Sequence, residues 1–187
     1  MVIVEKEIFS QVEVKKSLFI SHLVPTNEFE QRLNDLRETH KKANHHVWAF
    51  RRLNDNGQIE EGASDDGEPS GTSGPPTLRI LQGNELINCA IITIRYFGGT
   101  KLGTGGLVRA YGESAKSVIK DACFKPYKKL QTTEISIIFK KIPHVEYLCE
   151  QKNVQIIKRK FNEAGAIITL EGVEKDLEKI CAAIVLR

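Results

Sequence analysis

Residues 87–111 read INCAIITIRYFGGTKLGTGGLVRAY, and this stretch decides the fold of the longer part of the chain. Its first ten residues, 87–96, form a nearly unbroken apolar run, as expected for a strand that is buried on both faces of a sheet. A glycine-rich loop at residues 98–106 follows, and we expect a helix from about residue 107 to 122. Free backbone N–H groups at the start of such a helix favour anions, so the sequence predicts a phosphate-binding loop.

A second glycine-rich segment lies upstream, at residues 62–76 (GASDDGEPSGTSGPP). It is acidic and has Ala63 as its only apolar residue, so it cannot bury an apolar face and is expected to be a loop. Residues 95–109 instead contain three cations and no acid. Two interpretations stay open: the basic loop binds phosphate, or the two oppositely charged loops pair with each other. The glycine spacing matches neither common phosphate-loop motif, G-x-x-x-x-G-K-[ST] or G-x-G-x-x-G.

The segments before the acidic loop alternate between strand and helix patterns. Residues 12–24 are rich in β-branched and aromatic residues and predict a strand. Asn27 and Glu30 predict the start of an amphipathic helix that continues to about residue 40, with Asn27 as its cap. Residues 45–53 return to a strand pattern. The order of elements therefore predicts that strands alternate with a helix in this part of the chain.

The run Lys125–Lys129 is the expected domain junction, because proline and like charges both oppose a continuing helix. We expect a first domain at residues 1–127 and a smaller one at 128–187. In the smaller domain the patterns predict strands at 131–139, 154–161 and 166–170 and helices at 143–152 and 173–181, with 183–187 as a candidate last strand. This βαββα order fits a split βαβ sheet with its helices on one face.

Composition limits the classes of function. The chain has 187 residues, 41% hydrophobic and 27% charged, which is ordinary for a globular protein. A net charge of +3 does not by itself indicate nucleic-acid binding. The four cysteines are at least 26 residues apart, which argues against zinc sites and redox pairs, and Cys89, Cys123 and Cys181 are expected in the core. Residues 1–16 resemble no signal peptide or membrane span, so we expect a cytoplasmic protein.

The candidate site combines the two loops with basic residues elsewhere. The candidate phosphate- or nucleic-acid-binding residues are Arg51, Arg95, Gly98, Gly99, Lys101, Gly103, Gly105, Gly106 and Arg109. The acidic loop contributes Asp65, Asp66, Glu68 and Ser70, and a secondary basic patch comprises Lys158, Arg159 and Lys160. If several of these cations share one face, they would bind RNA phosphates through salt-dependent contacts. Tyr96, Phe97 and Tyr111 either stack on exposed bases or belong to the core.

Catalysis is the competing interpretation. Asp65, Asp66 and Glu68 could hold Mg²⁺ beside a phosphate, which would suit a phosphotransferase. A hydrolase would use Ser70 or Ser73 with one of the two adjacent histidines, but no G-x-S-x-G nucleophile elbow is present. The sequence favours binding over catalysis, and we assign no catalytic residue, metal or cofactor.

Taken together, Asp65–Thr72 and Arg95–Tyr111 resemble the signature of the IMPACT/YigZ family, and His45–Ala49 matches the strand that precedes them in that family. The resemblance is close over residues 13–125. Residues 130–187 more loosely resemble the small C-terminal domain of the bacterial two-domain members. The last helix stops near Arg187, which puts the final strand of that domain in doubt.

This resemblance implies an α+β fold with two domains. The first would be a left-handed βαβ domain of the ribosomal-protein/GHMP-kinase type, and the second a ferredoxin-like α/β sandwich. Eukaryotic relatives regulate translation initiation, partly through a further N-terminal domain that we do not expect here. The resemblance thus implies a translation-associated binding protein that contacts RNA or the ribosome and modulates translation under stress. A protein partner from the translation machinery is the next candidate, and no membrane partner is expected.

Overall fold

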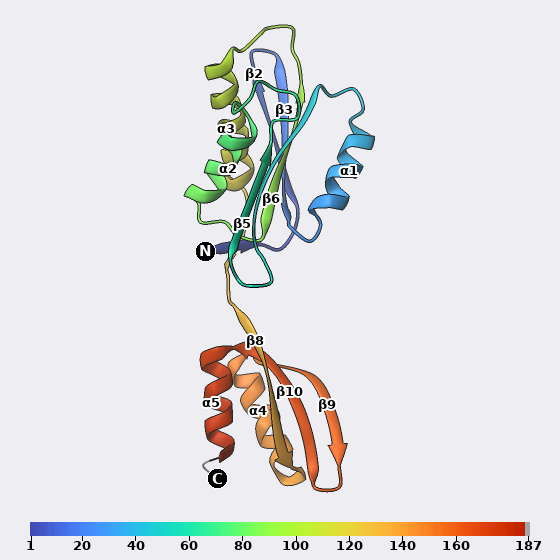
Figure 1. Cartoon of the computed structure of the whole chain (residues 1–187), viewed down its shortest axis with the longest axis vertical. Coiled ribbons are helices and arrows are strands. Elements are labelled where there is room, and N and C mark those ends of the chain that lie inside the picture. Colours follow the sequence, from blue (N-terminus) through green and yellow to red (C-terminus); the bar gives the residue numbers. More distant parts are fainter. Residues whose placement is uncertain (186–187) are drawn as a thin grey trace. The chain divides into compact units, whose positions relative to one another are not determined.

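The computed structural model describes residues 1–185. The chain divides into two compact units, Met1–Tyr127 (unit 1) and Lys128–Arg187 (unit 2), each of which is described by itself (Figure 1). The mixture of helices and sheets in both units confirms the α+β class.

The centre of unit 1 is a five-stranded sheet in which all neighbouring strands are antiparallel. In spatial order its strands are β2 (Ile8–Val14), β3 (Ser17–Pro25), β6 (Cys89–Tyr96), β4 (His45–Leu53) and β5 (Ile59–Ser64). Seven of the eight residues of β6 are buried, which confirms the predicted central strand. Two short strands, β1 (Val2–Val4) and β7 (Phe124–Pro126), pair with each other beside the sheet.

Helices cover both faces of this sheet (Figure 1). The helix α1 (Phe29–Thr39) packs on one face, and α2 (Gly74–Gly83) and α3 (Thr104–Lys120) pack on the other. Because side chains alternate along a strand, Ile91 contributes to the core under α2 and α3, whereas Ile92 contributes to the core under α1. The sheet is therefore buried on both sides, as the apolar pattern of β6 requires.

Three predicted boundaries differ in the structure. Asn27 does not cap α1, since the helix begins at Phe29 and no side chain caps it. The acidic segment is shorter than expected, because β5 includes Gly62–Ser64 and α2 begins at Gly74, where Pro75 and Pro76 suit a first helical turn. The helix α3 begins at Thr104, three residues earlier than predicted. The acidic loop is thus residues 65–73, and the glycine loop is residues 97–103.

The two crossover connections of unit 1 have opposite hands. Both β3–α1–β4 and β5–α2–β6 join parallel strands and skip the one strand between them. The two connections differ in three respects. The strand β5 runs antiparallel to β3, the step from β5 to β6 goes across the sheet in the reverse direction to the step from β3 to β4, and α2 lies on the face opposite to α1. Three reversals invert the hand, so one of the two is left-handed, although right-handed crossovers prevail in proteins. The expected left-handed βαβ unit is therefore confirmed.

Unit 2 has the predicted βαββα order. Its elements are β8 (Leu130–Ile138), a 3₁₀ turn (Phe139–Lys141), α4 (Ile142–Lys152), β9 (Gln155–Asn162), β10 (Gly165–Val173) and α5 (Glu174–Val185). The strand β10 lies between β8 and β9, and α4 and α5 pack on one face of this sheet around Ile168 and Leu170. The candidate last strand is wrong as far as residue 185, because residues 183–185 are helical; residues 186 and 187 lie outside the described part of the chain.

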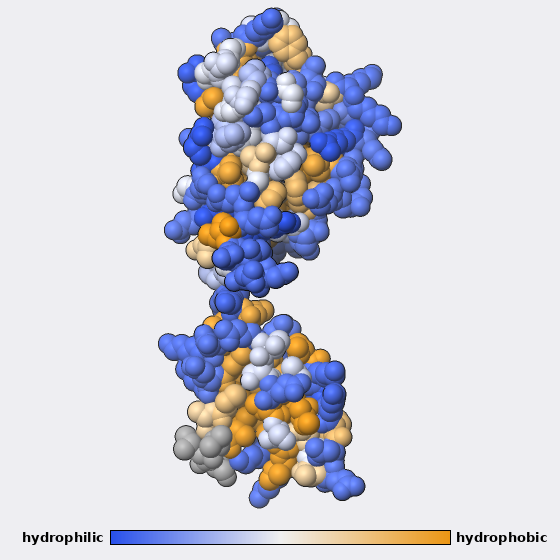
Figure 2. All heavy atoms as spheres, in the orientation of Figure 1, coloured by the Kyte–Doolittle hydropathy of each residue, from blue (hydrophilic) through white to orange (hydrophobic). Residues whose placement is uncertain are grey.

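Surface properties differ between the two units. Ile138, Phe139, Ile157 and Phe161 are exposed in unit 2, and Figure 2 shows apolar residues gathered over its sheet, whereas hydrophilic residues cover most of the visible face of unit 1. None of the helices within residues 1–185 has both the length and the hydropathy that crossing a bilayer requires.

The expected burial of the cysteines is wrong at one position. Cys89 is buried and Cys181 is half-buried, but Cys123 is exposed. It lies in the short connection between the end of α3 and β7, where the chain has left the sheet and runs over the surface.

Candidate functional site

The acidic loop and the glycine loop meet at a cavity of about 390 Å³ in unit 1. The polar part of its lining comes from Glu68, Arg95, Lys101 and Thr104. Apolar lining is contributed by Pro69, Phe97, Leu102 and Leu107. The structure therefore brings together members of both predicted loops at the start of α3.

Three glycines shape the glycine loop. Gly99 and Gly103 have φ values of +84° and +70°, which residues with a Cβ rarely adopt. Gly98 lies against the turn between β2 and β3, and a Cβ there would overlap the backbone of Lys16. The loop is therefore anchored to that turn at one end and joined to α3 at the other.

A buried ion pair joins the acidic loop to the end of β6, directly before the glycine loop. The Arg95 guanidinium donates a hydrogen bond of 2.7 Å to Glu68 Oε1, and the side chains are only 6% and 3% exposed. The Tyr111 hydroxyl donates to the same oxygen at 2.7 Å. Burial and the neighbouring Glu68 carboxylate both raise the pKa of Tyr111 far above its usual value, so this hydroxyl stays a donor. The interpretation that the acidic segment pairs with the basic segment 95–109 is confirmed at this contact.

One hydrogen-bond donor of Arg95, the residue beneath the cavity, has no acceptor among the described residues. Arg95 lies between the rings of Phe19 and Phe97, 5.5 and 5.7 Å from their centroids. Its Nε atom is buried, and no described residue accepts a hydrogen bond from it. The second carboxylate oxygen of Glu68 lies 3.8 Å from His45 Nε2. Buried donors are usually paired, so this Nε is an exception; because it has almost no exposed surface, it lies within the packed core and not on the wall of the cavity.

The rim of the cavity has the chemistry of an anion site. Gly103 is the N-cap of α3, and no side chain caps the helix, which leaves first-turn N–H groups available. The 17-residue helix also places the positive end of its dipole there. Lys101 is exposed at the rim and forms no ion pair among the described residues. These groups favour a phosphate or another oxyanion.

Asp65 and Asp66 build the acidic loop from within. Asp65 accepts hydrogen bonds from the backbone N–H groups of Gly71, Ser73 and Gly74 and from the Ser73 hydroxyl, at 2.6 to 2.9 Å. Asp66 accepts from the backbone N–H of His46 at 2.6 Å. Within residues 1–185, no group of three or more His, Cys, Asp or Glu side chains could hold a metal ion. These carboxylates therefore fix the loop and the start of α2.

Replacing Asp65 with alanine should destabilise unit 1 by about 1 kcal/mol at neutral pH, the usual cost of losing a helix cap. Burial disfavours the charged form of Asp65, but the hydrogen bonds from Ser73, Gly71 and Gly74 outweigh it and lower the pKa of the carboxyl. A lowered folded-state pKa contributes stability above the unfolded-state pKa and loses it as the pH falls through the folded-state value. Urea denaturation should thus show the difference from wild type shrinking in acid; a constant difference would contradict the cap.

Other predicted residues lie away from the cavity. Arg51 pairs with Cys89 across β4 and β6, whereas His45 pairs with Arg95, so Arg51 is six residues or about 20 Å along the strand from the site. It is bound to Glu61 at 2.6 Å. Gly105 and Gly106 belong to the first turn of α3, not to the loop. Ser70 is exposed in the acidic loop.

Of the predicted aromatic residues only Phe97 lies at the cavity, and the second basic patch belongs to unit 2. Tyr111 is fully buried, Tyr96 is half-buried with its hydroxyl bonded to His40, and Phe97 is 44% exposed at the cavity. Lys158, Arg159 and Lys160 lie on β9 in unit 2, where Arg159 forms an ion pair with Glu146 at 2.8 Å. Their part in nucleic-acid binding stays a prediction.

Sequence reasoning missed two features of the site. It did not predict that Tyr111 bonds to Glu68, 43 residues away, because an aromatic residue in a helix stripe gives no sign of a distant partner. It also missed Arg79 and Lys116, which lie with Arg109 along a groove between α2 and α3. The helical spacing of Arg109, Gly112 and Lys116 on α3 was the available signal, since residues three and four apart share a face.

Comparisons with known proteins show the family to which the chain belongs. The model of the Impact N-terminal domain matches residues 15–119, more than half of the chain. An IMPACT family member from Haemophilus influenzae is 36% identical over 171 residues, 89% of this chain and 82% of its own length. The IMPACT family member YigZ of Escherichia coli is 34% identical over 150 residues, 78% and 72% of the two chains. A crystal structure described as that of a hypothetical protein aligns with a TM-score of 0.72 and 27% identity, over 97% of this chain and 89% of that one. The chain therefore belongs to the IMPACT family.

Proposed function

We propose that this chain is a translation-associated binding protein that contacts RNA, either free or in the ribosome, through phosphate groups held at the glycine loop. Family membership supports the link to translation, because eukaryotic relatives in this family are expected to regulate translation initiation. The location would be the cytoplasm, and modulation of translation under stress would be the outcome of the contact.

The observation that carries the proposal is the rim of the cavity. The free N–H groups at the start of α3 and the exposed cation of Lys101 lie at the same cavity, whereas the buried Arg95 beneath them is already paired with Glu68. Phosphate contacts of this kind give sequence-independent, salt-dependent affinity for RNA. The role of Arg95 is indirect, since Glu68 already occupies one side of its guanidinium.

Lys101→Ala should weaken binding of a short fluorescent oligouridylate by about fivefold at about 0.1 M salt, because it removes one phosphate contact. The slope of log affinity against log salt should fall by about 0.7 for single-stranded RNA. Fluorescence anisotropy over a series of salt concentrations measures both quantities, and the loss should be similar for oligonucleotides of different sequence.

Lys125→Ala is the matched control, because it makes the same change in net charge at an exposed lysine that pairs with Glu5. Lys125→Ala should leave the affinity for oligouridylate and the slope against log salt nearly unchanged. Melting curves of each variant separate folding from binding. If Lys101→Ala folds normally and keeps wild-type affinity and salt dependence, the glycine loop is a structural turn and this part of the proposal fails.

The alternative function is a phosphate-ligand-dependent enzyme, a phosphotransferase or a hydrolase. It is supported by the depth of the cavity, which reaches the buried Glu68 and Arg95. Contact with an RNA backbone alone does not require such depth. Turnover of a phosphate ester that disappears in Glu68→Gln, while RNA binding persists, would favour the enzyme.

A further inference from the structure

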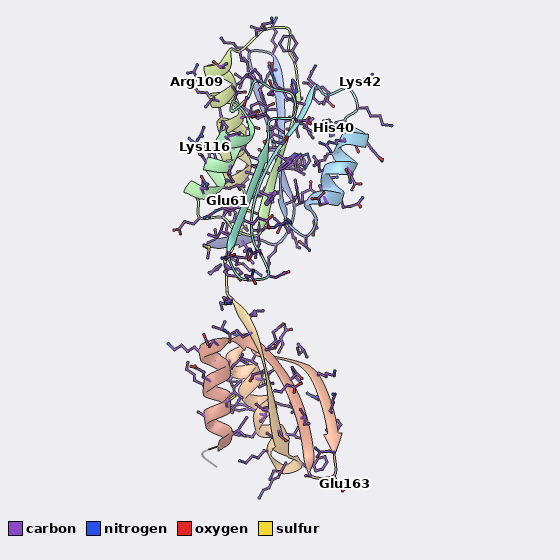
Figure 3. The ribbon with its side chains drawn as sticks, in the orientation of Figure 1. His40, Lys42, Glu61, Arg109, Lys116 and Glu163 are labelled. Atoms are coloured by element: carbon purple, nitrogen blue, oxygen red, sulfur yellow. The ribbon has the colours of Figure 1, made fainter. Side chains whose placement is uncertain are left out.

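A second basic cavity of about 370 Å³ lies between α2 and α3. Arg79 of α2 and Arg109 and Lys116 of α3 line it, and all three side chains are exposed. Its apolar surface comes mainly from Pro76, Ile80 and Val108. We call this cavity the α2–α3 groove. Figure 3 shows Arg109 and Lys116 on the α2–α3 side of unit 1, and His40 and Lys42 on the α1 side.

The pairing of arginines in unit 1 distinguishes this groove from the rest of the surface. Arg32, Arg37, Arg51, Arg52 and Arg95 each form an ion pair with a carboxylate. The remaining two arginines of unit 1 are Arg79 and Arg109, and neither pairs with a carboxylate of residues 1–185. Both line the α2–α3 groove. Glu113 is the one carboxylate in the lining of the groove, whereas each of the other five arginines of the unit is paired with a carboxylate.

Shared lining residues connect the groove to the glycine loop. Arg109 and Glu113 also line a cavity of about 200 Å³, together with Lys15 and Leu102. Leu102 in turn lines the cavity at the glycine loop. From Thr104 to Lys116 the helix rises about 18 Å, so one extended ligand could contact both ends of this path. The path carries Lys101, Lys15, Arg109, Arg79 and Lys116 in turn.

We infer that the α2–α3 groove binds the phosphate backbone of an RNA strand that continues from the glycine loop along α3. This inference rests on the proposed function, which it extends by a second contact surface. Guanidinium groups bind phosphate oxygens in a bidentate fashion, and two unpaired arginines on facing helices suit a flexible chain of phosphates. Pro76, Ile80 and Val108 offer an apolar surface to sugars and bases. A strand of RNA has enough phosphates to contact both the glycine loop and the α2–α3 groove. A short acidic protein segment would contact the groove alone, so the link between the two sites favours RNA.

The test measures binding of the same oligouridylate to four variants of the full chain. Arg79→Ala and Lys116→Ala should each reduce affinity about fivefold at about 0.1 M salt and lower the salt slope by about 0.7. Glu113→Gln should raise affinity, because it removes the one carboxylate of the groove. Arg52→Ala, which removes an arginine already paired with Glu60, is the control and should have little effect. All four side chains lie at least partly in solvent, and melting curves check that each variant folds.

The outcomes separate this inference from the proposed function. If Lys101→Ala weakens binding but Arg79→Ala and Lys116→Ala do not, the groove is not part of the RNA surface and the inference is wrong, while the glycine loop keeps its role. If the groove variants alone weaken binding, the groove is supported and the glycine loop is not. If the wild-type chain binds no oligouridylate, both fail. A poly-glutamate peptide whose binding depends on Arg79 and Lys116, with RNA binding unaffected, would assign the groove to acidic proteins instead.

Discussion

Glu68→Ala is expected to lower the free energy of unfolding of unit 1 by about 3–5 kcal/mol, because it leaves a buried guanidinium without its anionic partner. The Arg95 and Glu68 side chains are 6% and 3% exposed, so water cannot replace the lost carboxylate. Tyr111 loses its hydrogen-bond acceptor at the same time. Trp48, the one tryptophan of the chain, lies on β4, and its fluorescence during urea denaturation reports on unit 1.

Two comparisons isolate the buried pair. Glu60→Ala removes a carboxylate that also pairs with an arginine, but this pair is exposed and should matter little. In Glu68→Ala with Arg95→Met, no uncompensated charge remains, so the double variant should be less destabilised than Glu68→Ala alone. If Glu68→Ala is no more harmful than Glu60→Ala, the buried pair does not hold the two loops together.

Gly98→Ala is the second substitution with a large expected effect. The added Cβ would overlap the carbonyl group of Lys16, and a backbone carbonyl in the turn between two paired strands cannot rotate away as a side chain can. Overpacking of this kind costs about 1–3 kcal/mol, and we expect the upper end. The glycine loop should also shift from its anchor, so RNA affinity should fall together with the free energy of unfolding, measured by anisotropy and urea denaturation.

Gly105→Ala is the matched control for this substitution. Gly105 lies in the first turn of α3, and its added Cβ would come no closer than 3.9 Å to its nearest neighbour, Arg109. Alanine should stabilise the helix there by up to about 0.5–1 kcal/mol. The glycine spacing had placed Gly105 in a loop, where a side chain could strain the turn. Because Gly105 is helical, a side chain there is not expected to strain the backbone. Equal stabilities of the two alanine variants would contradict the close packing of Gly98.

Much of unit 1 follows from its sequence, because burial leaves a periodic pattern. The apolar run at β6 predicted a central strand, and the predicted helix after the glycine loop is present and buries Leu107, Tyr111, Val118 and Ile119. The boundaries at Thr104 and Gly74 were less predictable. The backbone N–H of Gly74, the first residue of α2, donates to Asp65, nine residues earlier, and a helix start that depends on a distant carboxylate leaves no local signal.

The candidate site was predictable as a location but not as a set of contacts. The sequence predicted a glycine-rich loop directly before a helix, and the structure has one there, since that pattern depends only on neighbours in the chain; anion binding at this loop stays a prediction. Arg95 had the right charge and position for phosphate, yet Glu68 binds it from 27 residues away. Pairing between distant residues is a property of the folded state, so a count of local charges could not show which cations remain free, such as Arg79 and Lys116.

The central position of β6 has a consequence for the order of events during synthesis. The hairpins β2–β3 and β4–β5 join neighbouring segments and can form as soon as each has left the ribosome. They cannot meet, because the strand that lies between them is the last of the five to emerge. Until then β3 and β4 each present an unpaired edge and apolar faces, the state in which nascent chains aggregate. The growing chain is therefore most prone to aggregation after β5 has emerged and before β6 pairs with both β3 and β4.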